Sequence, residues 1–155
     1  MNDFRFRPAT REDAEEVADV YLESRKTFLG FAPMAHSDES VRGWIASHLI
    51  PSGGVTVALA SGPMAPLVAM MALSREERVG WIDQLYLRPS VVGIGIGARF
   101  VERAKEELGS PIRLYTFQEN EGARRFFERH GFRILELGDG SGNEEGCPDV
   151  LYEWS

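Results

Sequence analysis

Cysteine is nearly absent from this chain, and long apolar runs are missing altogether. Cys147 is the single cysteine in 155 residues, which excludes an intramolecular disulfide framework and a cysteine-rich zinc site. No 18 consecutive residues are apolar, and the start of the chain lacks the basic and apolar regions of a secretion signal. We therefore expect a cytoplasmic protein without a membrane partner.

Positive charge is scarce as well. The sequence contains 17 Lys and Arg residues against 24 Asp and Glu residues, a formal net charge of -7. A polyanion needs clustered Lys and Arg to neutralise its many phosphates, so nucleic acid is not an expected partner. His36 and His48 have no metal-ligand spacing with each other or with a pair of carboxylates, so we expect no metal.

The rest of the composition is that of an ordinary folded domain. Hydrophobic residues make up 43% of the chain and charged residues 26%, and the length predicts one domain over 1–155. Apolar periodicity predicts strands at 4–8, 55–60, 67–73, 79–87, 112–117, 132–137 and 149–154, and helices at 10–25, 38–49, 97–108 and 121–130. This order predicts an α/β sandwich (α+β) with one mixed sheet.

A glycine-spaced turn follows the predicted strand at 79–87. Gly93, Gly95 and Gly97 stand at the entrance to the predicted helix at 97–108. Glycines let the main chain approach a ligand and adopt positive φ, while free N–H groups at a helix start attract an anion. The pattern predicts a phosphate-binding turn, with a tight, closely packed turn as the alternative.

The same glycines also fit a dinucleotide-binding pattern loosely. Gly93, Gly95 and Ala98 satisfy G-x-G-x-x-G/A. In a dinucleotide fold this turn belongs to the first βα unit, whereas here antiparallel-looking strands precede it and little chain follows. A Walker motif is excluded because no Gly-Lys-Ser or Gly-Lys-Thr is present. A dinucleotide oxidoreductase is therefore the least favoured interpretation.

Two segments carry a resemblance to a known family. Segment 92–97 reads Val-Gly-Ile-Gly-Ile-Gly, with Val92 where the family has Arg or Gln before its glycines. Segment 120–132 has Asn120, Ala123, a Phe-Phe pair and a terminal Gly-Phe, with Phe127 where the family has Tyr. At this spacing the chain resembles the GNAT superfamily of acyl-CoA-dependent N-acetyltransferases over nearly its whole length.

The resemblance implies a mixed, mostly antiparallel central sheet flanked by about four helices, and acetyl-CoA as co-substrate. It implies transfer of the acetyl group to a primary amine by direct attack in a ternary complex. By position, the main chain of Leu85, Tyr86 and Leu87 would bind pantetheine and polarise the thioester carbonyl. The pyrophosphate would rest on Val92, Gly93, Ile94, Gly95, Ile96 and Gly97, and Asn120 and Phe126 would line the pantetheine arm.

The chemistry needs a group that takes a proton from the acceptor ammonium and one that protonates the leaving thiolate. Asp83, two residues before Leu85, is the predicted base. Phe127 cannot donate a proton as the family's tyrosine does. Tyr115 and Tyr86 are the candidate replacements, and Tyr115 is the predicted catalytic residue. A thiol leaves tolerably near neutral pH, so loss of the acid should slow the reaction without abolishing it.

The acidic residues of the C-terminal hairpin predict a binding site for a cationic acceptor. Glu144 and Glu145 lie between the last two predicted strands and Asp149 stands at the start of the second, in a stretch without Lys or Arg. The expected partner is a small-molecule or peptide amine, and an acidic, solvated hairpin is the alternative. Because Val92 and Phe127 depart from the family pattern, an acyl-CoA-binding module with little turnover also stays open. Assembly of the chain into a homodimer is a further open alternative.

Overall fold

A seven-stranded mixed sheet, in the order β1-β2-β3-β4-β5-β7-β6, organises the chain. The computed structural model describes residues 4–32 and 34–155. The strands are β1 (Phe4–Pro8), β2 (Val55–Ala60), β3 (Leu67–Glu76), β4 (Val79–Leu87), β5 (Ile112–Phe117), β6 (Arg133–Leu137) and β7 (Asp149–Trp154). The mixed α/β fold and the mostly antiparallel sheet that the sequence predicts are confirmed.

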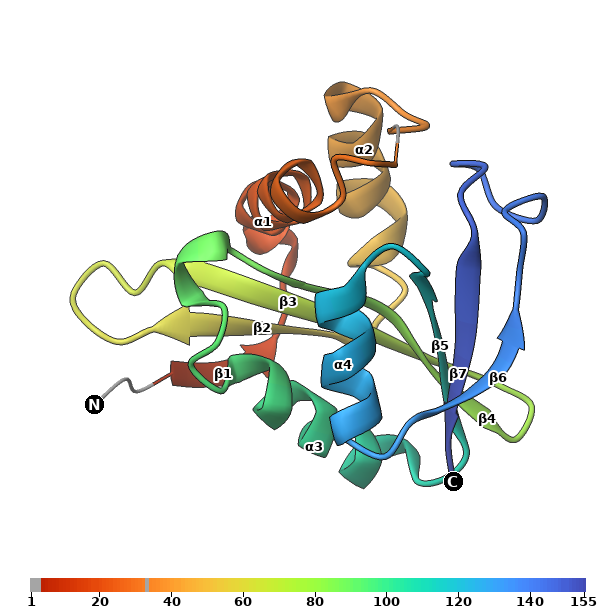
Figure 1. The fold of residues 1–155 in the computed structure, drawn as a ribbon. Coiled ribbons are helices and arrows are strands. Elements are labelled where there is room, and N and C mark those ends of the chain that lie inside the picture. The colour runs from red at the N-terminus through yellow and green to blue at the C-terminus, as the bar shows by residue number, and fades with distance from the viewer. Residues whose placement is uncertain (1–3, 33) are drawn as a thin grey trace.

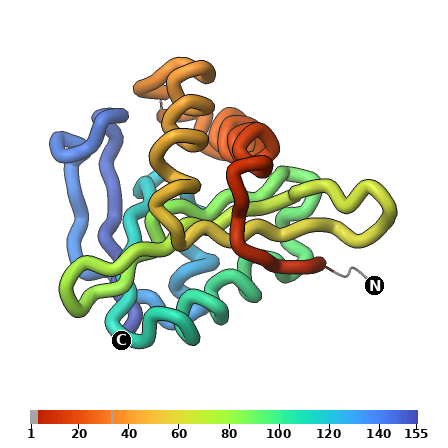
Figure 2. The backbone as a smooth tube through the Cα atoms, turned by 180° about the vertical axis from the view of Figure 1, so that it is seen from behind, coloured from red at the N-terminus to blue at the C-terminus, as the bar shows by residue number. Residues whose placement is uncertain are grey.

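The helices cover both faces of this sheet (Figures 1 and 2). They are α1 (Ala14–Phe28), α2 (Asp38–Trp44), α3 (Ile96–Leu108) and α4 (Glu121–Arg129). One continuous α-helix was expected over 38–49, but α2 ends at Trp44 and a π-helical segment, Ile45–Leu49, continues it. None of the described helices combines the length and apolar character that crossing a bilayer requires.

Two hydrophobic cores lie on opposite faces of the sheet because strand side chains alternate. The first core joins Phe100 and Val101 of α3 and Phe127 of α4 to the sheet. The second joins α1 and α2 to β2 and β3. The consecutive residues Met70 and Met71 of β3 are both fully buried, one in each core. The α3–α4 layer and the α1–α2 layer therefore share the central strands.

β4 and β5 form the parallel pair of the sheet. Their pairing is confined to Gly80 with Ile112 and Trp81 with Arg113. β4 nevertheless continues to Leu87, so the carboxyl-terminal parts of the two strands separate. β5 is held on its other side by β7, with which it pairs along its whole length. The sheet consequently opens between β4 and β5, at the end where the glycine-spaced turn begins.

Candidate functional site

The open edge of β4 presents main-chain groups that have lost their partner strand. The Arg88 N–H donates to the Val68 carbonyl of β3 at 2.9 Å. Main-chain groups alternate in direction along an antiparallel strand, so those of Leu85 and Leu87 point away from β3. Among the described residues, no β5 residue pairs with either one. Leu85 and Leu87 therefore offer free donors and acceptors to a ligand between the strands.

A β-bulge lies just before these residues. Ala72 of β3 pairs with Gln84, and Leu73 pairs with Ile82, so Asp83 is the extra residue of β4. A bulge bends the strand and redirects the side chains around it. Ile82 packs in the core under α3, and alternation places Asp83 on the opposite face, the α1 side of the sheet.

The glycine-spaced turn forms the entrance to α3. Gly93 has a φ of 86° and Gly95, the N-cap of α3, has a φ of 101°, conformations that glycine adopts at low cost. Ile96 is buried in the core and anchors the start of the helix, while the Ile94 side chain is exposed. The first N–H groups of α3 have no carbonyl partner within the helix, which makes this end attractive to an anion.

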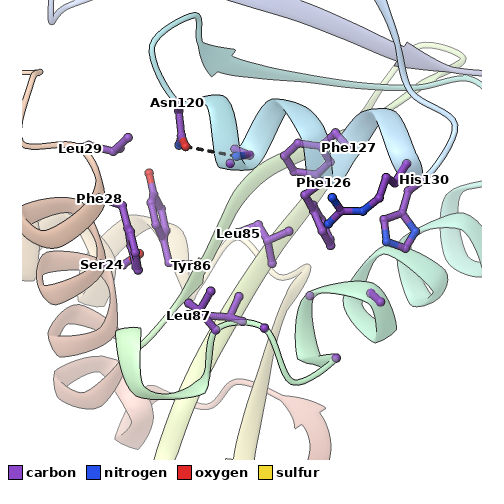
Figure 3. Close-up of a pocket in the computed structure, with 18 residues that line it drawn as sticks. Ser24, Phe28, Leu29, Leu85, Tyr86, Leu87, Asn120, Phe126, Phe127 and His130 are labelled. Atoms are coloured by element: carbon purple, nitrogen blue, oxygen red, sulfur yellow. Dashed lines mark hydrogen bonds between the residues drawn. The ribbon is translucent and has the colours of Figure 1, made fainter.

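A cavity of about 500 Å³ joins these elements (Figure 3). Ser24, Phe28 and Leu29 reach it from the end of α1, whereas Gly97 and Phe126 reach it from α3 and α4. Since α1 and α3–α4 lie on opposite faces, the cavity follows the free edge of β4 from one face of the sheet to the other, and α4 with Asn120 lines its opposite wall. The predicted residues that line it are Leu85, Tyr86, Leu87, Val92, Gly93, Gly95, Gly97, Asn120 and Phe126. Ile94 and Ile96 are not among its lining residues.

α4 contributes one wall of the cavity. The Asn120 side-chain oxygen accepts a hydrogen bond from the Ala123 N–H at 3.2 Å and so caps the helix (Figure 3). Phe126 packs so closely on α3 that a Cβ at Gly97 would meet the Phe126 ring at 3.1 Å. Phe127 is 7% exposed. It supplies an apolar ring to the cavity and no hydroxyl.

Several lining residues were not predicted from the sequence. The positions of Ser24, Phe28 and Leu29 in the cavity wall become visible only in the fold, because the assembled sheet brings the end of α1 to this opening. Arg129 and His130 also line the cavity, from the end of α4. Burial and the nearby charges of Lys105 and Arg129 lower the pKa of His130. Arg129 and His130 stand directly before Gly131 in the sequence, and this position at a helix end could have marked them as candidate site residues.

The two predicted catalytic residues lie outside the lining of this cavity. Asp83 is an exposed residue overall, but its carboxyl is partly buried. This burial raises the pKa of Asp83 and outweighs a hydrogen bond with Ser74, which acts to lower it. Tyr115 is 61% exposed and stacks on Trp81 with ring centroids 5.8 Å apart. Ile112 and Leu114 belong to the core under α3, so alternation places Tyr115 on the same face as Asp83.

Tyr86 belongs to a polar cluster on the α1 side of the cavity. Arg25 Nη1 donates to Tyr86 Oη at 3.3 Å, and Arg25 Nη2 lies 3.3 Å from Glu145 Oε2. The Tyr21 and Tyr86 rings meet edge to face, with centroids 4.8 Å apart. Burial is the main cause that raises the pKa of Tyr86 and raises that of Tyr21 to about 12. Both phenols therefore keep their protons at neutral pH.

The three acidic residues predicted to bind the acceptor already have protein partners. Glu145 pairs with Arg25, and Glu144 lies 2.9 Å from His36 Nε2. Asp149 accepts from the Asn143 side chain at 3.1 Å. The first two contacts attach the β6–β7 loop to the α1–α2 region, and the third lies within the hairpin itself. In the described part of the chain, no group of three or more His, Cys, Asp or Glu side chains is arranged so that it could hold a metal ion.

Comparison with known proteins identifies the family of this chain. The family model described as "Acetyltransferase (GNAT) family" matches residues 3–132. A protein of Archaeoglobus fulgidus described as an uncharacterized N-acetyltransferase is 31% identical over 147 residues, covering 89% of this chain and 98% of that protein.

Solved structures share the fold over almost their full length. Apo YjaB from Escherichia coli has a TM-score of 0.77 at 20% identity, covering 98% of this chain and 97% of that one. The PaiA N-acetyltransferase from Thermoplasma acidophilum, solved in complex with coenzyme A, has a TM-score of 0.73 at 22% identity and covers 99% of both chains. The chain belongs to the acetyltransferase (GNAT) family.

Proposed function

We propose that this protein is an N-acetyltransferase that moves the acetyl group of acetyl-CoA to a primary amine by direct attack in a ternary complex. The observation that carries the proposal is the cavity along the free edge of β4, which reaches the glycine-spaced turn at one end and α1 at the other. A cofactor and an acceptor that enter from opposite faces can meet where the strands separate. Membership of the acetyltransferase family supports acyl-CoA as the donor.

The cofactor half of the site consists mostly of main chain. The pyrophosphate would bind the N–H groups at the start of α3, where the helix dipole favours an anion. The pantetheine would run along β4 and bond to the free main-chain groups of Leu85 and Leu87, with Phe126 on its other side. Val92 supplies no cation here, but Arg129 lines the cavity and supplies one.

The acceptor half lies on the α1 face. Asp83 would take the proton that the acceptor ammonium must lose, directly or through a water. Its environment suits a base, because a raised pKa strengthens the affinity of the carboxylate for that proton. The acceptor would be a small-molecule or peptide amine. Glu144, Glu145 and Asp149 would act on it through their charge and through the shape of the loop that their contacts hold.

Amine-dependent release of CoA from acetyl-CoA tests this function. The purified protein should release thiol in the presence of at least one member of a broad panel of primary amines, and acetyl-CoA should raise its melting temperature by binding the folded state. A dinucleotide oxidoreductase would instead be stabilised by NADH and not by CoA. Stabilisation by CoA without release for any amine would favour an acyl-CoA-binding module, the alternative that the apolar Phe127 motivates.

A further inference from the structure

We propose that Tyr86 is the catalytic acid of the transfer, giving its phenolic proton to the departing CoA thiolate while Arg25 stabilises the phenolate that results. The inference rests on the proposed function, because it needs acetyl-CoA in the cavity. It assigns a chemical role to the Tyr86 side chain, whereas the proposed function uses only the main chain on either side of it.

The step balances within the ternary complex. The amine nitrogen attacks the thioester carbonyl carbon, the C–S bond breaks, and its electron pair leaves on sulfur. The Tyr86 O–H proton passes to the sulfur. The nitrogen of the new amide carries one proton too many, and that proton restores the Tyr86 phenol through water. The step needs no further reactant.

Tyr86 is in position for this step. Among the tyrosines of the described chain, it is the one that lines the cavity. The free main-chain groups of Leu85 and Leu87, which would hold the thioester, flank it along β4. In Figure 3 its side chain rises from β4 beside Phe28, and its hydroxyl is directed toward the side of the cavity where Asn120 lies.

Arg25 is the group that stabilises negative charge on the Tyr86 oxygen. Arg25 is 7% exposed, and its guanidinium donates to Tyr86 Oη at 3.3 Å. A guanidinium stays charged at any working pH, so this hydrogen bond strengthens when the phenol gives up its proton. The other titratable groups that face Tyr86 are Tyr21 of α1 and Glu145 of the β6–β7 loop.

The other lining side chains suit the role less well. Phe127 has no proton to give. His130 lies beside Phe126, with ring centroids 4.7 Å apart, at the end of the cavity away from Asn120 (Figure 3). Its lowered pKa leaves a neutral imidazole near pH 7. Ser24 offers only an aliphatic hydroxyl, a far weaker acid than a phenol.

Hydroxylamine as acceptor isolates the proposed step. It is neutral at pH 7, so removal of a proton before attack does not limit the rate. With acetyl-CoA and hydroxylamine, Tyr86→Phe should lower kcat about ten- to a hundredfold, with KM for acetyl-CoA changed less than about twofold. Wild-type kcat should fall at alkaline pH as the phenol ionises, and this decline should be absent from the variant. Tyr152→Phe, which removes a buried phenol that donates to Glu128 at 2.7 Å, is the matched control.

A rescue variant separates catalysis from folding. Phe127 lines the same cavity, so a tyrosine there can supply a phenol to the same thiolate. The double variant Tyr86→Phe/Phe127→Tyr should therefore regain part of the kcat that Tyr86→Phe loses. If Tyr86→Phe lowered kcat only by destabilising the protein, the second substitution would not restore it. Equal rates for wild type and Tyr86→Phe, or an alkaline decline that persists in the variant, would overturn the role of Tyr86 and leave the proposed function standing. Wild-type protein that neither binds acetyl-CoA nor releases CoA with hydroxylamine would overturn the proposed function, and the role of Tyr86 with it.

Discussion

Asp83, the proposed base, is an exposed carboxylate on the α1 side of β4. It is the extra residue of a β-bulge, which bends β4 just before Leu85. Partial burial penalises its charged form and raises its pKa. A carboxylate with a raised folded pKa destabilises the fold once it ionises, so the protein retains a residue here that costs stability.

Replacement of Asp83 should therefore separate activity from stability. Asp83→Asn should lower kcat for a cationic amine about a hundredfold at neutral pH, with a smaller loss for hydroxylamine, which is already neutral. Its melting temperature should equal or exceed that of the wild type, because asparagine carries no charge to desolvate. Steady-state kinetics and thermal unfolding check both. A variant with unchanged kinetics would exclude Asp83 as the base.

Substitution of Gly95, the N-cap of α3, tests the proposed phosphate site. Its φ of 101° begins α3, and a Cβ there would meet nothing within 4 Å, so alanine brings backbone strain without a clash. Strain of about 1–2 kcal/mol in this conformation should displace the turn and weaken CoA binding about tenfold, as calorimetric titration would measure. Gly62→Ala is the control, because Gly62 also has a positive φ and open space but lies in the β2–β3 turn. Equal losses of affinity would argue against a phosphate site at Gly95.

Among the elements, the start of the α1 segment shows how local sequence fixes the frame of the site. The Asp13 carboxylate accepts from the Thr10 N–H at 2.7 Å and from the two terminal guanidinium nitrogens of Arg7, Nη1 and Nη2, at 2.7 and 3.0 Å. These contacts join the end of β1 to the helix that delivers Ser24 and Phe28 to the cavity. The hydrogen bond from Arg7 is the main cause that lowers the pKa of Asp13.

Asp13→Asn should destabilise the fold by about 1–3 kcal/mol at pH 7 in urea unfolding. A carboxyl whose folded pKa lies below its unfolded value contributes stability above the unfolded pKa and loses it as the pH falls through the folded one. The difference between wild type and variant should therefore shrink below about pH 4. Glu12→Gln, in the same turn but exposed, should cost less than about 0.5 kcal/mol. A difference that stays constant down to pH 2 would contradict this account.

The sequence predicted the elements well because each has its own local signal. The glycines at 93–97 and the capping pattern at 10–13 mark helix starts, and alternation marks the strands. The separation of β4 from β5 has no local signal, because pairing joins strands that are distant in the sequence and neither strand's own pattern shows where that pairing ends. For the same reason the sequence could not place Tyr115 relative to the cavity or bring Ser24 into it.

For the whole molecule, contacts between distant segments close the site. Arg25 and Glu145 are separated by 120 positions in the sequence, and their side chains are 8% and 17% exposed. Their pair attaches the β6–β7 loop to α1 beside Tyr86. The sequence suggested Glu145 as a ligand for a substrate cation, but a distant cation of the same chain occupies it, which no local pattern could reveal.

Loss of this pair should loosen the molecule as a whole. Arg25→Met leaves Glu145 and Tyr86 without their donor and should cost about 1–3 kcal/mol of unfolding free energy, with faster proteolysis of the β6–β7 loop. Lys26→Met, which breaks the exposed pair of Lys26 with Asp38, should cost less than about 0.5 kcal/mol. Urea unfolding and limited proteolysis measure both. Equal costs for the two variants would mean that the buried pair does not hold the loop.

The most direct test of acetyl transfer through this cavity follows the acetyl group itself. The protein is incubated with acetyl-CoA labelled with 13C in the acetyl group and with the amine that gives the fastest CoA release, and the amine product is examined by mass spectrometry. The account predicts one labelled acetyl group on the amine nitrogen, in an amount equal to the CoA released and dependent on the protein. Label recovered only in free acetate, or remaining in acetyl-CoA, would contradict it.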